Sequence, residues 1–288
     1  MSGRKLQTAT WSVPRPSAEA LVACLVFVAT AVAITVVWEV AGDAVTDVAL
    51  YQSYGERIAD GLVPYRDFGF EYPPAALPAL VLPALVTGSL HAYRIAFVTE
   101  MALVGVLAVL AFDAVLRRLD VRRGERVVSL SVVALAPLLL GGVILTRFDL
   151  VPAALAAAAL ALAVAGRTRA AALVVGLGAA VKLYPALLVP LLAVDAWRKG
   201  GRRELAIVLG LAAAPVALAY VAFLAIAPDG VLDSFGRQLG RPLQIESVGA
   251  GVLLALHQAA GTGLSWTCLL YTSPSPRDRT RSRMPSSA

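Results

Sequence analysis

The sequence is short of charged residues, cysteine and histidine, and each shortage excludes a class of protein. Charged residues make up 15% of the 288 positions and hydrophobic residues 59%, whereas an ordinary soluble domain is about a quarter charged. A water-soluble enzyme and a disordered chain are therefore excluded, because this much apolar surface has to be buried in lipid. Two cysteines and two histidines are too few for a disulfide framework or a histidine metal site. We expect no cofactor, although the composition is compatible with a divalent metal.

Positive charge is in modest excess, and half of it lies at the C-terminal end. The net charge is +6, and residues 277–288 hold four arginines against one aspartate. The basic character therefore belongs in large part to the last residues, and we expect no nucleic-acid partner.

Residues 268–288 are unlike the rest of the chain. They are rich in Ser, Pro and Arg, which cannot build a core and are typical of a disordered basic C-terminus. On reverse translation, however, Cys268–Asp278 can be encoded by a widely used transposase-type sequencing adapter, and Arg283–Ala288 by the downstream end of that adapter. We therefore predict that residues 268–288 are a non-native tail, that the natural protein is longer, and that the tail takes no part in the fold.

The first apolar run fixes the expected orientation. Ala20–Trp38 is nineteen residues without a charge, long enough for one helical crossing of a hydrocarbon core about 30 Å thick. Arg4, Lys5 and Arg15 precede it, so residues 1–18 should form a cytoplasmic N-terminus. No small-residue cleavage site follows the run, which indicates a retained helix rather than a signal peptide.

Loop charges predict the remaining topology of a multi-pass cell-membrane protein. The acidic segment Glu39–Pro74 should lie outside. Three arginine-bearing segments should be cytoplasmic: Arg117–Arg126, Gly166–Arg169 and Arg198–Arg203. The crossings expected between them are Ile95–Leu116, Val127–Thr146, Leu150–Ala165 and Leu205–Ala227, with another beginning at Val248–Trp266.

Two apolar stretches are too short or too interrupted for a simple crossing. Ala75–Gly88 is broken by two prolines, so we expect an interfacial or re-entrant helix on the outer side. Residues 169–198 begin and end in the cytoplasm, which requires an even number of crossings. Lys182 and Pro185 interrupt the stretch, which predicts two short helices meeting at a polar turn. The fold class is thus an all-α polytopic membrane domain over residues 19–267.

Four groups of polar residues fall on the outer face in this topology. Their carboxylates can accept a proton, their cations can stabilise phosphate charge, and their aromatic rings can stack on sugars. The groups are the acidic loop, with Asp43, Asp47, Gly61-Leu62-Val63-Pro64-Tyr65 and Phe70-Glu71-Tyr72-Pro73-Pro74; Arg147-Phe148-Asp149; Lys182-Leu183-Tyr184-Pro185; and Arg241-Pro242-Leu243-Gln244-Ile245-Glu246-Ser247.

The order of these motifs resembles glycosyltransferase family 87. The shared features are a first helix, an acidic loop of the form Asp-x3-Tyr, Gly-x2-Pro-Tyr and Glu-Tyr-Pro-Pro, then Arg-Phe-Asp, Lys-Leu-Tyr-Pro and Arg-x-Leu-Gln-x-Glu-Ser. The resemblance covers roughly Val22–Gly261, and family members continue through several further helices. It implies the N-terminal portion of a GT-C membrane fold, of the kind found in actinobacterial envelopes. It also implies transfer of a hexose, expected to be mannose, from a polyprenyl-phosphate donor to a lipid-linked or cell-envelope glycan on the outer face.

The same resemblance assigns roles to individual residues. Asp47, four residues before Tyr51, would be the catalytic base, and Asp149 a second catalytic acid. The donor phosphate would be bound by Arg147, Lys182, Tyr184 and Arg241. Weaker substrate contacts are expected from Tyr51, Tyr65, Glu71, Tyr72, Gln244 and Glu246. None of these residues is expected to bind a metal.

Several assignments have alternatives. Asp43 could exchange roles with Asp47. Asp149 could instead pair with Arg147 or cap the helix that starts at Leu150, and Lys182 could extend to the outer interface. For the whole chain, the alternative is a transporter or flippase of a lipid-linked precursor, because intramembrane charge and broken helices also mark transport paths.

Overall fold

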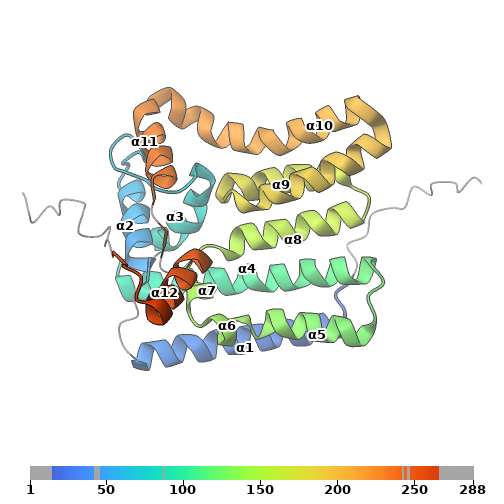
Figure 1. Cartoon of the computed structure of the whole chain (residues 1–288), viewed down its shortest axis with the longest axis horizontal. Helices are drawn as coiled ribbons and strands as arrows, with labels where there is room; N and C mark the ends of the chain where they lie inside the picture. Colours follow the sequence, from blue (N-terminus) through green and yellow to red (C-terminus); the bar gives the residue numbers. More distant parts are fainter. Residues whose placement is uncertain (1–14, 42–45, 87, 242, 245–246, 266–288) are drawn as a thin grey trace, which may run out of the picture. The chain divides into compact units, whose positions relative to one another are not determined.

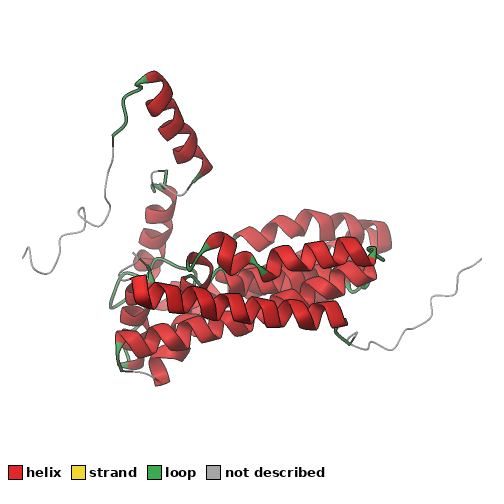
Figure 2. Cartoon of the chain, turned by 90° about the horizontal axis from the view of Figure 1, so that it is seen from below, coloured by secondary structure: helices red, strands yellow, loops and turns green. Residues whose placement is uncertain are grey.

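The computed structural model describes residues 15–41, 46–86, 88–241, 243–244 and 247–265. The chain divides into two compact units, Met1–Gly236 and Arg237–Ala288, and each is described by itself. The regular elements of the described residues are all helices, apart from an isolated bridge between Pro64 and Phe68 (Figure 1 and Figure 2). The predicted all-α fold is confirmed.

The helices differ greatly in length. The first unit contains α1 (Ala18–Ala41), α2 (Val48–Ala59), η1 (Pro74–Ala76), α3 (Leu77–Val86), α4 (Leu90–Arg118), α5 (Arg123–Ala134), α6 (Ala136–Leu140), α7 (Val143–Thr146), α8 (Leu150–Val164), α9 (Thr168–Val181), η2 (Tyr184–Leu188), α10 (Val189–Ile226) and most of α11 (Pro228–Leu239). The second unit contains the end of α11 and α12 (Val248–Ala260). The predicted tail, residues 268–288, lies outside the described residues.

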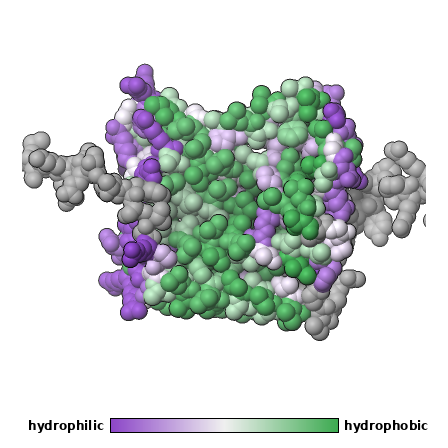
Figure 3. All heavy atoms as spheres, turned by 180° about the vertical axis from the view of Figure 1, so that it is seen from behind, coloured by the Kyte–Doolittle hydropathy of each residue, from purple (hydrophilic) through white to green (hydrophobic). Residues whose placement is uncertain are grey.

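Three helical segments found in the described part of the chain are long and apolar enough to cross a membrane. They are Ala18–Val37, Leu90–Arg118 and Tyr184–Ile226. On the face seen in Figure 3, a hydrophobic band covers the first unit between hydrophilic surfaces at its two ends. A band of this kind matches the hydrocarbon core of a bilayer. The predicted membrane fold is therefore confirmed.

The third of these segments is two helices joined at a pair of glycines. Gly200 and Gly201 have non-helical backbone angles, and Gly201 has a φ of 60°, which glycine adopts without steric cost. Lys199 just before the break donates to Thr168 Oγ1 (2.8 Å) and Glu204 just after it pairs with Arg169 (2.6 Å), both at the start of α9. The chain therefore turns back at Gly200. The two short helices expected within residues 169–198 are α9 and the first part of α10.

Residues 127–146 differ from the expected single crossing. This stretch contains three helices, α5, α6 and α7, and Gly141 between the last two has a φ of 65°. With a ψ of −162° as well, Gly141 has a mirror-image extended backbone that glycine adopts readily and that interrupts the helix. Val127–Thr146 was predicted only as a crossing, and the apolar pattern gave no sign of these breaks because apolar residues suit continuous and broken helices equally well.

Two short helices lie at the end of the first unit opposite the arginine-bearing connections (Figure 1). They are α2 and α3, and α2 runs across the direction of the long helices. They pack closely because Gly55 of α2 has no side chain: a Cβ there would lie 2.5 Å from the carbonyl oxygen of Leu80 in α3. The expected short helix on the outer side is therefore α3, and the acidic segment before it contains α2.

Candidate functional site

Three connections of the first unit meet near α2 and carry both predicted catalytic aspartates and two of the predicted phosphate-binding cations. They are the residues just before α2, the link between α7 and α8, and the link between α9 and η2. Helices α8 and α9 have 15 and 14 residues, which at 1.5 Å per residue is about 22 and 21 Å. Both start or end at the arginine-bearing end and are shorter than the roughly 30 Å hydrocarbon core. A helix of this length that starts at one membrane surface ends before it reaches the other.

Asp47 and Arg147 are brought together from 100 positions apart in the sequence. Arg147 Nε lies 3.5 Å from Asp47 Oδ2, and the two side chains are 33% and 39% exposed. Asp47 directly precedes α2 without a side-chain cap hydrogen bond. Its carboxylate is thus turned to the arginine and remains accessible to a ligand.

Asp149 and Lys182 form a second ion pair beside the first. Lys182 Nζ donates to Asp149 Oδ1, and both side chains are about two-fifths exposed, at 43% and 41%. Tyr184 Oη donates to the backbone oxygen of Asp149 at 3.3 Å. Asp149 precedes α8 without a side-chain cap hydrogen bond. The alternatives from sequence were a pair with Arg147 or a cap of the helix at Leu150; the structure instead pairs Asp149 with Lys182.

Phe148 explains why its two neighbours face the site. Its side chain is 2% exposed, and its ring lies 5.6 Å from the Tyr51 ring and 5.0 Å from the Tyr72 ring. Lys182 Nζ lies 5.6 Å from the centre of the same ring, within the range of a cation–π contact. Burying the central residue of Arg-Phe-Asp leaves both charged neighbours half-exposed.

Tyr51 and Tyr65 are buried in an aromatic cluster rather than displayed to a ligand. Tyr51 is 2% and Tyr65 6% exposed. Burial raises the pKa of both phenols, with a further contribution from Tyr72 for Tyr51 and from Tyr220 for Tyr65. Their positions favour a supporting role over the direct substrate contacts expected from sequence.

The loop between α2 and η1 is held by a few strong contacts. Tyr65, with a φ of 67°, donates its hydroxyl to the backbone oxygen of Tyr72. Asp67 accepts from the backbone of Val63 at 2.7 Å and from Arg66 at 2.9 Å. Arg66 first, and then the Val63 N–H, lower the pKa of Asp67 to about 2. These contacts position the half-buried Glu71 and Tyr72 next to the aromatic cluster.

The remaining predicted residues cannot be placed against this site. Arg241 and the exposed Gln244 belong to the second unit. Glu246 and the alternative base Asp43 lie outside the described residues. Within the described ranges, no group of three or more His, Cys, Asp or Glu side chains could hold a metal ion.

Sequence reasoning missed the structural role of the buried rings. Tyr54 contacts Phe68, Phe70 and Tyr72 at 5.0 to 6.4 Å between ring centres. It lies three residues after Tyr51 on α2, so the two rings share one face of that helix. The Tyr51–Tyr54 spacing was therefore the available signal for a packed aromatic face.

Comparison with known proteins agrees with the order of the motifs. The family model of glycosyltransferase family 87 matches residues 70–273, which include Arg147, Asp149 and Lys182. No curated protein and no solved structure shows a significant match. Because the matched region is more than two thirds of the 288 residues, this all-α membrane chain belongs to glycosyltransferase family 87.

Proposed function

We propose that this membrane glycosyltransferase transfers a hexose, expected to be mannose, from a polyprenyl-phosphate donor to a lipid-linked or cell-envelope glycan. The observation that carries the proposal is the pair of ion pairs, Asp47–Arg147 and Asp149–Lys182. Two cations and two carboxylates on three connections supply both the phosphate-binding and the proton-accepting groups that such a transfer requires.

The cations would hold the donor phosphate. Arg147 pairs with Asp47 and Lys182 with Asp149, and both cations remain partly exposed, so an incoming phosphate can reach them. As the sugar C1–oxygen bond breaks, its electron pair passes to the phosphate oxygen, and nearby cations stabilise that charge. Electrostatic stabilisation of this kind is often the largest contribution to catalysis.

Asp47 would be the base. The acceptor hydroxyl oxygen attacks C1 of the sugar while its proton passes to the Asp47 carboxylate. A phosphate bound at Arg147 would also draw that arginine away from Asp47 and leave the carboxylate available. Attack from the face opposite the phosphate inverts the anomeric centre, as in inverting glycosidases.

The position of the site suits a donor that stays in the bilayer. The links after α7 and α9 would lie below the membrane surface, because α8 and α9 are shorter than the hydrocarbon core. A polyprenyl chain could remain in lipid while its phosphate reaches Lys182. With the arginine-bearing connections and the N-terminus in the cytoplasm, the site opens on the outer face.

The proposal is tested with membranes that contain the protein and radiolabelled polyprenyl-phosphate mannose, glucose or galactose. We expect label to pass from one of these donors to an acceptor glycan with inversion, and Asp47→Asn to abolish most of the transfer. Movement of an intact labelled lipid between leaflets, without transfer of its sugar, would contradict the proposal and favour a flippase.

A further inference from the structure

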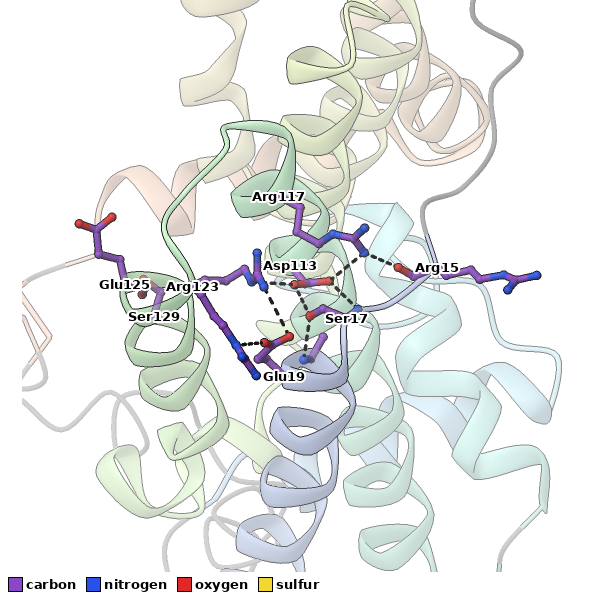
Figure 4. A network of polar contacts seen from close by, with 10 residues as sticks. Arg15, Ser17, Glu19, Asp113, Arg117, Arg123, Glu125 and Ser129 are labelled. Atoms are coloured by element: carbon purple, nitrogen blue, oxygen red, sulfur yellow. Dashed lines mark hydrogen bonds and ion pairs between the residues drawn. The ribbon is translucent and has the colours of Figure 1, made fainter.

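The arginine-bearing end of the first unit has a polar network of its own, far along α4 from the site (Figure 4). Its centre is Asp113 of α4, which is 2% exposed. Ser17, just before α1, donates its hydroxyl to Asp113 at 2.8 Å and its backbone N–H at 3.2 Å. Arg117 and Arg126 approach the same carboxylate at 4.0 and 3.9 Å. The network ties the start of α1 to α4 and α5.

A second carboxylate of the network, Glu19 of α1, is contacted by two arginines. Arg123 Nε lies 2.6 Å from one oxygen and Arg126 Nη2 lies 3.4 Å from the other. Three arginines therefore face two carboxylates, which leaves an excess positive charge. Arg123 is the accessible cation of the group, because its side chain is 80% exposed. Arg126 is largely covered, at 17% exposed.

An apolar groove begins at this positive charge and runs between α1 and α5. It has a volume of about 310 Å³, at the lower end of the range of ligand pockets. Along α5 and the residue after it, the lining runs from Arg123 to Leu135, a rise of about 18 Å at 1.5 Å per residue. It is lined by Ala18, Glu19, Val22, Ala23, Val26, Arg123, Val127, Leu130, Ser131, Ala134 and Leu135.

The chemistry of the groove changes from one end to the other. Its charged residues, Glu19 and Arg123, lie at the mouth, and the rest of the lining is apolar except for Ser131. An exposed cation at the headgroup level above an apolar channel complements a lipid with a negative headgroup and a hydrocarbon tail. Basic pockets between membrane helices on the cytoplasmic side bind anionic headgroups.

We propose that the groove between α1 and α5 is a binding site for an anionic glycerophospholipid. The phosphate contacts Arg123, and one acyl chain lies along Val26, Val127 and Leu130. The lipid comes from the leaflet at the arginine-bearing end, which is the cytoplasmic leaflet in the proposed orientation. The site is separate from Asp47 and Lys182 and does not depend on the proposed reaction.

The experiment uses the purified full chain in nanodiscs of phosphatidylcholine, with phosphatidylglycerol titrated in as the probe. Bound lipid is counted by native mass spectrometry after release from the nanodisc. We expect phosphatidylglycerol to be retained in preference to phosphatidylcholine. Arg123→Gln keeps a donor for Glu19 but removes the charge, and it should weaken phosphatidylglycerol retention about fivefold. Arg122→Gln changes an exposed neighbour that does not line the groove, and it should have little effect.

A second pair of variants tests the acyl chain. Ser131→Trp fills the groove and should abolish retention of one phosphatidylglycerol molecule, whereas Val132→Trp, on the next residue of α5 and outside the groove, should not. Equal retention of both lipids by the unaltered protein would overturn the proposal. Equal losses from Arg123→Gln and Arg122→Gln would overturn it as well, because the lipid would then respond to general surface charge. Normal retention by Ser131→Trp would also overturn it, because the acyl chain would then not occupy the groove.

Discussion

Lys182 contacts Asp149 across 33 positions of sequence, and this ion pair joins the two short helices α8 and α9 at the site. Neither side chain is used in a helix cap: the side chain of Asp149 makes no cap hydrogen bond to α8, and Lys182 ends α9 through its backbone N–H, which donates to the Gly178 oxygen. The pair is therefore maintained by charge and can separate when a phosphate competes for the lysine.

Asp47→Asn should remove the proton acceptor while keeping the shape of the side chain. Loss of general-base help lowers rates by roughly 100- to 10,000-fold, so transfer should fall by about that much with donor binding little changed. Initial rates and donor affinity measured on the same membranes check this. Asp43→Asn is the matched control, and a loss confined to Asp43→Asn would transfer the role to that residue.

Lys182→Ala should affect binding and catalysis together. Its charge acts on the phosphate before and during bond breaking, so donor affinity should weaken and the rate of transfer should fall roughly 100- to 1,000-fold. Lys199→Ala, which removes a lysine paired with Asp195 at the opposite end of α9, should leave both values near normal. Normal donor affinity in Lys182→Ala would show that the phosphate lies elsewhere.

Gly55→Ala should destabilise the packing of α2 against α3. The new Cβ would lie 2.5 Å from the carbonyl oxygen of Leu80 and 2.7 Å from Ala84 Cβ, and overpacking of this kind typically costs about 1–3 kcal/mol. The melting temperature in detergent should fall by several degrees. Glu56→Ala, at an exposed position of the same helix, should melt normally, and an unchanged Gly55→Ala would refute the close contact.

Asp67 should keep the loop between α2 and η1 ordered at every physiological pH. Because its folded pKa is lowered from 3.8 to about 2, its stabilisation is present above about pH 3.8 and is lost only as the pH falls through about 2. Protease cleavage within residues 61–72 should therefore be equal at about pH 4.5 and pH 7. Asp67→Asn should raise cleavage at both, while Asp60→Asn should not.

Orientation is testable with single cysteines in a chain lacking Cys24 and Cys268. Ala59 and Gly124 are both exposed, so accessibility alone does not distinguish them. If loop charge governs orientation, an impermeant thiol reagent should label Ala59→Cys and not Gly124→Cys in intact cells. The reverse pattern would turn the proposed site towards the cytoplasm.

Loop charges and apolar lengths were sufficient to predict α1, α4, α3 and the turn at Lys182. A bilayer restricts the chain to crossings of fixed length, so few arrangements are compatible with the positions of the arginines. The partners of the charged residues could not be predicted in this way. The direction in which Arg147 points depends on where the Phe148 ring packs. That ring packs against Tyr51 and Tyr72, which come from a distant segment of the sequence.

The break in residues 127–146 shows a different limit. Leu138, Leu139 and Leu140 are suited to lipid in a straight or a broken helix, and only the φ of 65° at Gly141 distinguishes the two. Sequence patterns thus predict where the membrane lies better than how the helices end within it.

The shortness of α8 and α9 makes the protein sensitive to the thickness of its bilayer. Helices α8 and α9 are about 22 and 21 Å long, whereas the hydrocarbon core is about 30 Å thick. For the proposed donor phosphate to meet Lys182, its headgroup would have to descend several ångströms or the membrane would have to thin locally. Each ångström of mismatch has a modest free-energy cost. The acyl-chain length of the surrounding lipid therefore acts on the approach of the donor without touching any residue of the site.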